Sequence, residues 1–144
     1  MTDILASIGL VQVDRAEEIL NKRHYIVEKY NKAFIGLNGV EILNHFETIG
    51  SSCHLYLVRF PEKDESFRNE FMDRMLAKGV ATNVHYKPLP LLTAYKKLGF
   101  DISDYPNAYN MYKNEVTLPL FTLLTNEQID YVIEKFRETY KEMM

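Results

Sequence analysis

The sequence predicts an α+β fold, a small antiparallel sheet of three to four strands with helices packed on it. Two observations predict this class. Apolar residues recur at helical spacing in several segments, and short apolar runs bounded by turn residues lie between them. The order is two helices, a hairpin, then helix, strand, helices, strand and helix, which favours helices on one face of the sheet. Because the 144 residues contain no internal repeat or linker, we expect a single domain over residues 1–144.

The first 34 residues predict two helices. One runs from Thr2 to about Val13, where Thr2 is a suitable N-cap and the carboxylate of Asp3 suits the positive end of the helix dipole. The other runs from about Arg15 to Phe34 and has a charged face typical of a solvated side. The apolar stripe of the first helix consists of Ile4, Leu5, Ile8 and Val11.

A hairpin follows, with strands at Val40–Glu47 and Cys53–Phe60 joined through the turn residues at 50–52. The second strand has apolar residues on both faces and is therefore expected at the centre of the sheet. An amphipathic helix, a strand at Val80–Tyr86 and a short helix at Leu91–Leu98 come next. The apolar residues of that amphipathic helix are Phe67, Phe71, Met72, Met75 and Leu76, and Gly79 stands at its C-terminal end.

The C-terminal part predicts a helix from Pro106 to about Lys113 and a strand at Glu115–Leu120. Pro119 lacks a backbone donor, so this strand is expected at a sheet edge. Thr125 and Gln128 have the spacing of a capping box that begins the last helix. The buried stripe of this helix is expected to consist of Ile129, Val132, Ile133, Phe136 and Tyr140.

The composition excludes several function classes. A net charge of −3 argues against a nucleic-acid-binding surface. No apolar run approaches the roughly 20 residues that cross a bilayer, and the N-terminus lacks the basic start of a signal peptide. Cys53 is alone, so we expect a buried, inert thiol and a reducing, cytoplasmic location.

The candidate site is the stretch from Val84 to Pro90. Two prolines stiffen the backbone where the predicted strand ends, and His85, Tyr86 and Lys87 supply an imidazole, a phenol and an ammonium there. On an extended backbone His85 and Tyr86 would leave on opposite faces. Rigid polar groups on a loop suit a binding site, although a strand end with solvated side chains is the alternative.

Other chemistry is sparse. The sequence has no phosphate-binding glycine loop, no nucleophile elbow and no paired ligands at metal spacing. His24 lies in a helix and is expected to be structural, and His45 and His54 are expected to form a cross-strand pair because no third metal ligand is evident. Lys96 and Lys97 lack a desolvating pocket. We therefore predict no catalytic residue and no metal, in a chain that contributes to a site without containing all of it.

Six stretches also resemble, in the same order, motifs of a known family. They are MTDILASIGLVQ (1–12), KR with YN (22–31), HLYLVR (54–59), GVATNVHYKPL (79–89), YPNA (105–108) and LPL (118–120). These stretches are similar to motifs of the DegT–StrS sugar-nucleotide aminotransferases, which are pyridoxal-phosphate enzymes of the aspartate-aminotransferase fold.

The resemblance implies that the chain corresponds to the C-terminal small domain of such an enzyme, and that Met1 is an internal methionine of a longer parent sequence. The parent would transfer an amino group from an amino acid to a nucleotide-linked keto sugar. No segment here is similar to the family's lysine-bearing domain. Pyridoxal phosphate is therefore expected in the parent, with none bound covalently to this chain and no aminotransferase activity of the chain alone.

The resemblance also implies roles for individual residues. His85 would contact the sugar nucleotide, Tyr86 and Lys87 would border its pocket, and Thr2 and Asp3 would lie at a subunit interface near the active site of a homodimer or larger assembly. Three residues depart from the family pattern, namely Pro90, Tyr109 and Thr117. Two alternatives remain open: a non-enzymatic binding or assembly module, and one half of a split enzyme.

Overall fold

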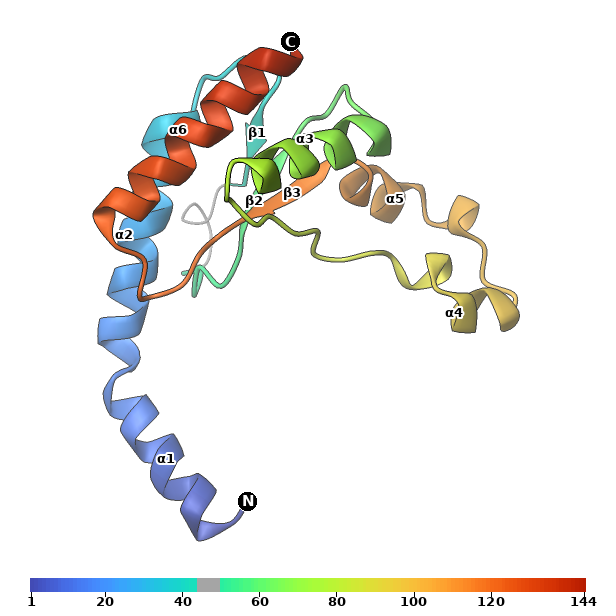
Figure 1. The fold of residues 1–144 in the computed structure, drawn as a ribbon. Helices are drawn as coiled ribbons and strands as arrows, with labels where there is room; N and C mark the ends of the chain where they lie inside the picture. Colours follow the sequence, from blue (N-terminus) through green and yellow to red (C-terminus); the bar gives the residue numbers. More distant parts are fainter. Residues whose placement is uncertain (44–49) are drawn as a thin grey trace.

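A computed structural model describes residues 1–43 and 50–144, and Figure 1 shows their arrangement. The α-helices are α1 (Asp3–Asp14), α2 (Ala16–Phe34), α3 (Glu65–Ala77), α4 (Thr93–Lys97), α5 (Pro106–Tyr112) and α6 (Asn126–Met143). The strands are β1 (Glu41–Ile42), β2 (Tyr56–Arg59) and β3 (Glu115–Leu118), and two short 3₁₀ helices are η1 (Leu89–Leu91) and η2 (Ile102–Asp104).

The three strands form one antiparallel sheet in the order β1-β2-β3. Ile42 pairs with Val58 between β1 and β2, and Val58 pairs with Val116 between β2 and β3. The predicted α+β class is therefore confirmed, and β2 is central as its two apolar faces indicate. β3 lies at the edge of this sheet, as Pro119 predicts.

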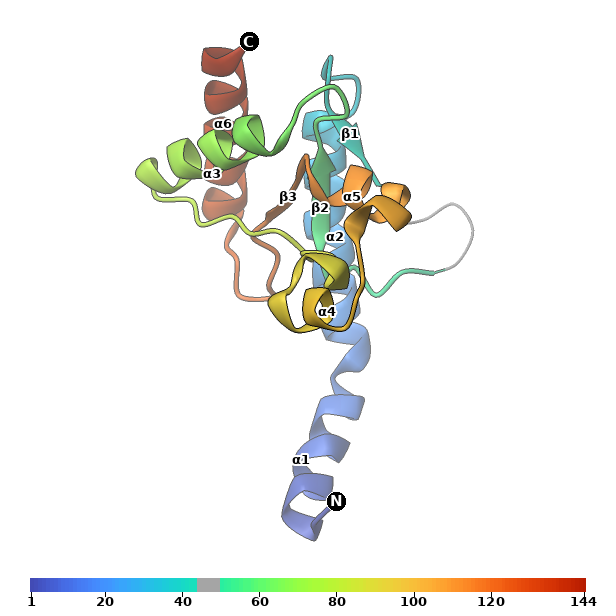
Figure 2. The ribbon, with the colours of Figure 1, turned by 90° about the vertical axis from the view of Figure 1, so that its right-hand side faces the viewer.

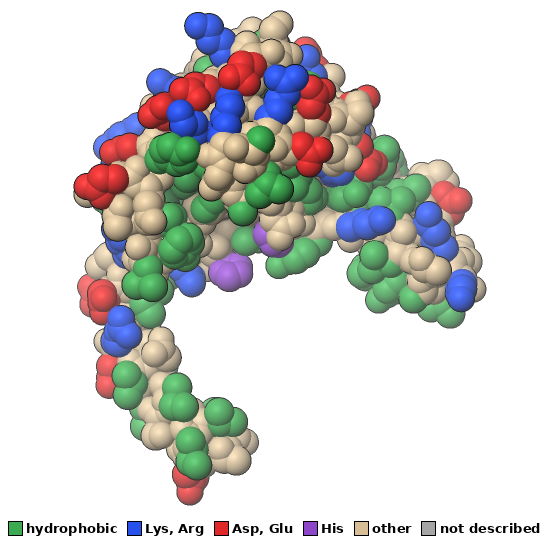
Figure 3. Space-filling model, in the orientation of Figure 1, with side chains coloured by type: hydrophobic (Ala, Val, Ile, Leu, Met, Phe, Trp, Pro, Cys, Tyr) green, Lys and Arg blue, Asp and Glu red, His purple; other side chains and the backbone are tan. Residues whose placement is uncertain are grey.

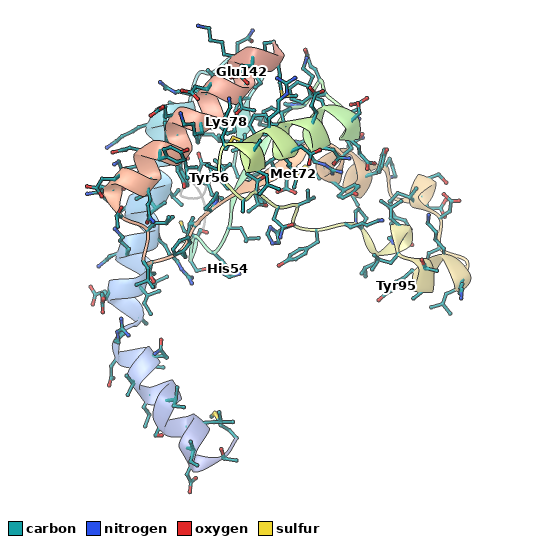
Figure 4. All side chains as sticks on the ribbon, viewed as in Figure 1. His54, Tyr56, Met72, Lys78, Tyr95 and Glu142 are labelled. Carbon is teal, nitrogen blue, oxygen red and sulfur yellow. The ribbon has the colours of Figure 1, made fainter. Side chains whose placement is uncertain are left out.

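The face of the sheet that carries Tyr56 and Val58 packs against α2, α3 and α6. The rings of Phe34 and Phe136 lie 4.4 Å apart and those of Phe71 and Phe136 lie 5.1 Å apart, which joins the three helices into one aromatic core. An ion pair of 2.7 Å between Lys78 Nζ and Glu142 Oε1 links the end of α3 to α6 (Figure 4). The helices thus occupy one face, and the opposite face of β3 is left for polar side chains.

Side-chain caps determine where several helices begin. Thr2 accepts a hydrogen bond from the backbone nitrogen of Leu5, and Asp64 accepts one from Phe67 at the start of α3. Thr125 and Gln128 form the predicted capping box, with bonds of 3.0 and 3.3 Å between side chain and backbone. These side chains satisfy backbone donors that the first helical turn leaves unpaired, so the predicted starts at Thr2 and Thr125 are confirmed.

The predicted strand at Val80–Tyr86 is wrong. Only Asn83 bridges β3, through two backbone hydrogen bonds to Thr117, and the next donors bond to side chains instead of a neighbouring strand. His85 and Tyr86 therefore do not alternate across a sheet, and their rings contact each other edge to face at 4.7 Å. The peptide bond between them is cis.

Other predicted bounds are too long. β2 begins at Tyr56 because Cys53, although buried, has a left-handed φ of 49° that no strand permits. The helix predicted at Leu91–Leu98 is divided into η1 and α4. Leu76 is 62% exposed and lies off the buried face of α3. The second half of the first predicted hairpin strand, including His45 and its pairing with His54, falls outside the described residues.

Two extensions project on opposite sides from the body formed by the sheet and its packed helices, so the molecule has the form of an arch. α1 continues from the lower end of α2, and the segment with α4 extends on the other side (Figures 1 and 2). No residue of α1 is buried, although it carries Ile4, Leu10 and Val13, each at least 67% exposed. Of the helices in the described ranges, none has the length and apolarity needed to cross a bilayer.

Candidate functional site

The bridge at Asn83 determines where the candidate site lies. Its two backbone bonds to Thr117, of 3.1 and 2.7 Å, hold the segment that follows α3 along the free edge of β3. Glu115 and Thr117 alternate with Val116 and Leu118 along β3, so their side chains leave the face opposite the aromatic core. The segment consequently brings His85 beside both polar side chains.

His85 is held by two hydrogen bonds to β3. Its backbone nitrogen donates to Glu115 Oε2 at 3.0 Å, and its ring Nδ1 lies 2.9 Å from Thr117 Oγ1. Thr117 Oγ1 in turn donates to Glu115 Oε1 at 2.5 Å. The imidazole is thus fixed in position while its other nitrogen, Nε2, has no hydrogen-bond partner among residues 1–43 and 50–144.

Glu115 is the buried charge of this site, with only 4% of its surface exposed. Burial raises the pKa of the Glu115 carboxyl above its ordinary value because removal from water disfavours the ionised form. The hydrogen bonds from Thr117 and His85, and the charge of Arg68, act in the opposite direction on this pKa. The donors around the carboxylate partly compensate for its burial.

A cavity of about 320 Å³ opens beside these groups and is lined by His54, Thr82, His85 and Thr117 together with apolar residues. Figure 3 shows histidine side chains on the inner side of the arch, between the two extensions, and Figure 4 shows His54 there, below the sheet. The hydroxyl oxygen of Thr82 is buried and has no partner in the described part of the chain. The cavity therefore offers the imidazole groups of His54 and His85 to a polar ligand.

The structure brings together only some of the predicted site residues. His85 and Tyr86 are in ring contact, whereas Tyr86 is 71% exposed and Lys87 is exposed. Thr2 caps α1, and the N-terminus lies at the end of this helix that is remote from the sheet (Figure 1). His24 bonds through Nε2 to the carbonyl oxygen of Ser51 at 2.8 Å, which agrees with a structural role.

Sequence reasoning missed three residues of the site. Glu115 was not singled out, Thr117 appeared only as a departure from a family motif, and His54 was assigned to a cross-strand pair. The one available signal was polar residues at alternate positions, Glu115 and Thr117, in an otherwise apolar strand.

The side chains of this cavity do not by themselves fit pyridoxal phosphate. The cofactor needs a lysine amine for covalent attachment, and none of the described residues that line the cavity is a lysine. Lys87, which is close to His85 in sequence, is exposed. An attachment lysine would have to come from another segment or another chain.

Comparison with known proteins agrees with this partial site. The chain is 30% identical to the spore coat polysaccharide biosynthesis protein SpsC of Bacillus subtilis, over 98% of this chain and 37% of SpsC. It is 33% identical to the UDP-4-amino-4,6-dideoxy-N-acetyl-beta-L-altrosamine transaminase of Campylobacter jejuni, over 83% of this chain and 31% of that enzyme. The chain thus spans about a third of the length of these relatives.

Solved structures likewise match nearly all of this chain over about a third of their own length. Spr1654 of Streptococcus pneumoniae, provisionally named a sugar aminotransferase, superposes in its PMP form with a TM-score of 0.95 and 46% identity, over the whole of this chain and 36% of Spr1654. The aminotransferase TlmJ of Streptoalloteichus hindustanus superposes with a TM-score of 0.87 and 30% identity, over 99% of this chain and 37% of TlmJ. Residues 1–137 also match the sequence pattern of the DegT/DnrJ/EryC1/StrS aminotransferase family, so the chain belongs to this family.

Proposed function

We propose that the chain is the C-terminal part of a pyridoxal-phosphate-dependent aminotransferase that acts on a nucleotide-linked keto sugar with an amino acid as donor. The family membership supports the reaction class, and the transaminase of Campylobacter jejuni supports the sugar-nucleotide substrate. The observation that carries the proposal is His85, which β3 holds by two hydrogen bonds at a cavity on the inner side of the arch.

Each predicted residue has a role in this proposal. His85 binds the sugar nucleotide, Tyr86 borders the pocket, and the exposed ammonium of Lys87 meets the diphosphate as a point charge. Thr2 and Asp3 lie at the subunit interface of a homodimer or larger assembly. The cofactor supplies the electron sink of transamination, while this chain orients the sugar. We further propose that residues 1–144 form a single domain of a cytoplasmic protein.

The proposal is tested by combining this chain with a separately produced chain that carries the lysine domain of a family member. With pyridoxal phosphate, glutamate and a UDP-linked 4-keto sugar as the probe, we expect amino-sugar formation only when both chains are present. His85→Ala should lower this turnover at least tenfold, whereas the control Glu28→Ala, at an exposed position that does not line the cavity, should leave it unchanged within about twofold. Equal turnover with His85→Ala would contradict the role of His85.

The chain alone should form no amino sugar, because its cavity lacks an attachment lysine among the described residues. The absorbance of the chain with pyridoxal phosphate, before and after borohydride, is the direct check. A visible aldimine band together with a reduced lysine that peptide mapping locates would refute this statement.

The exposed apolar residues of α1 favour a second candidate, a non-enzymatic assembly module. In that case the chain would self-associate stably, and no lysine-domain chain would restore turnover. Recovery of turnover on mixing would instead support the parent reaction, and co-purification with a natural lysine-domain chain would identify a split enzyme.

A further inference from the structure

The contacts between Glu115, Thr117 and His85 constrain the protons of the site. One oxygen of Glu115 accepts from the backbone nitrogen of His85 at 3.0 Å, and the other accepts from Thr117 Oγ1 at 2.5 Å. Thr117 Oγ1 is also 2.9 Å from His85 Nδ1. With 4% and 5% of their surfaces exposed, Glu115 and Thr117 are shielded from competing water.

The chemistry of these groups leaves one arrangement of hydrogens when Glu115 is ionised. A carboxylate can only accept, so the single hydroxyl hydrogen of Thr117 points toward Glu115. The Thr117 oxygen can then only accept from His85, and Nδ1 of the neutral ring must carry the ring hydrogen. Nε2 is left as a lone-pair acceptor.

We propose that Glu115 and Thr117 are positioning residues that hold neutral His85 in the Nδ1–H tautomer, so that Nε2 accepts a hydrogen bond from the ligand. The ligand group that meets Nε2 must therefore carry a hydrogen, as a sugar or ribose hydroxyl does and a diphosphate oxygen does not. The tautomer follows from the contacts and the ionised Glu115, whereas the assignment of the ligand group to a sugar nucleotide rests on the proposed function.

Replacing Glu115 by glutamine should reverse the arrangement. The backbone nitrogen of His85 can only donate, so the amide oxygen must face it and the amide NH₂ must face Thr117. The Thr117 oxygen then accepts from this NH₂, and its hydrogen points toward Nδ1 of His85. The variant should consequently hold His85 as the Nε2–H tautomer.

Nitrogen-15 NMR of the histidine rings in the ligand-free chain tests this directly, on the alkaline side of a pH series, where the ring signals no longer change with pH. His85 signals are assigned from their loss in His85→Gln. We expect a predominantly Nδ1–H ring in the wild type and in Thr117→Ser, which keeps the hydroxyl, and a predominantly Nε2–H ring in Glu115→Gln. The control Glu28→Gln removes one exposed carboxylate and should leave the ring signals unchanged.

A wild-type His85 that is predominantly Nε2–H would overturn the proposal, and this result does not depend on any variant folding. An Nδ1–H ring in folded Glu115→Gln would overturn it as well. The measurement contains no substrate or cofactor, so failure of the proposed aminotransferase function would leave its outcome unaffected.

Discussion

Glu115 is the residue whose ionisation links the site to the stability of the fold. Burial raises the pKa of this carboxyl in the folded chain, so the folded state binds more protons than the unfolded state above the ordinary pKa of glutamate. Its contribution is therefore most favourable below that ordinary pKa and is lost as the pH rises through the raised folded pKa.

We predict that Glu115→Gln removes this loss of stability with rising pH. Because the amide does not ionise, the free energy of unfolding of the variant should increase relative to that of the wild type between pH 4 and pH 8. Urea denaturation followed by circular dichroism at both pH values measures the difference. Glu28→Gln is the charge-matched control at an exposed position, and a stability difference for Glu115→Gln that is independent of pH would contradict the prediction.

Single residues of the site could be predicted only where the signal was local. His85 was recognisable because two prolines and three polar side chains lie within a few positions of it. Its partners could not be recognised in the same way, since Glu115 and Thr117 follow it by 30 and 32 positions. Their contact depends on the bridge at Asn83, and no pattern within either segment specifies that bridge.

α6 begins with both hydrogen bonds of a capping box. The contribution of this cap to stability can therefore be measured by substitution. Thr125 accepts from the backbone nitrogen of Gln128, whose side chain bonds back to Thr125. Thr125→Ala should lower the free energy of unfolding by about 1 kcal/mol, the usual cost of removing a threonine cap. Urea denaturation should show Thr125→Ser close to wild type.

A matched control for this cap is Thr93→Ala, because Thr93 is exposed and is the first residue of α4, whose N-cap is Leu92 and whose start has no side-chain cap bond. If Thr93→Ala and Thr125→Ala destabilise the chain equally, the loss reflects general helix propensity rather than the capping box.

The main helices and β3 were predictable from sequence to within a few residues, whereas the strand predicted at Val80–Tyr86 was not found, for a physical reason. α1 and α6 begin at side-chain caps, and α2 and α6 have apolar residues at helical spacing within their own segments. A strand depends on what pairs with it, and the segment 80–86 makes a single bridge to β3 despite its apolar content. Pairing partners distant in sequence, rather than propensity, ended or prevented the predicted strands.

At the scale of the whole molecule, apolar surface faces solvent where a folded domain normally covers it. α1 has no buried residue, and the α4 side carries a cavity of about 380 Å³ lined by Pro88, Leu89, Tyr95, Phe100 and Tyr105. Figure 3 shows hydrophobic side chains on both extensions of the arch. Large exposed apolar patches of this kind mark surfaces for another polypeptide, which fits a chain that spans about a third of its relatives.

The isolated chain should therefore self-associate through α1 into a dimer or larger assembly. Ile8, which is 56% exposed at the middle of α1, is the position to change, because Ile8→Glu keeps a good helix former while placing a charge in the contact. Sedimentation velocity over a range of concentrations should show the wild type associating and Ile8→Glu shifted toward monomer. Leu123→Glu introduces the same charge at a residue that is 83% exposed outside α1, and it should associate like the wild type. A wild-type chain that stays monomeric at the highest concentration would show that these apolar residues do not drive association.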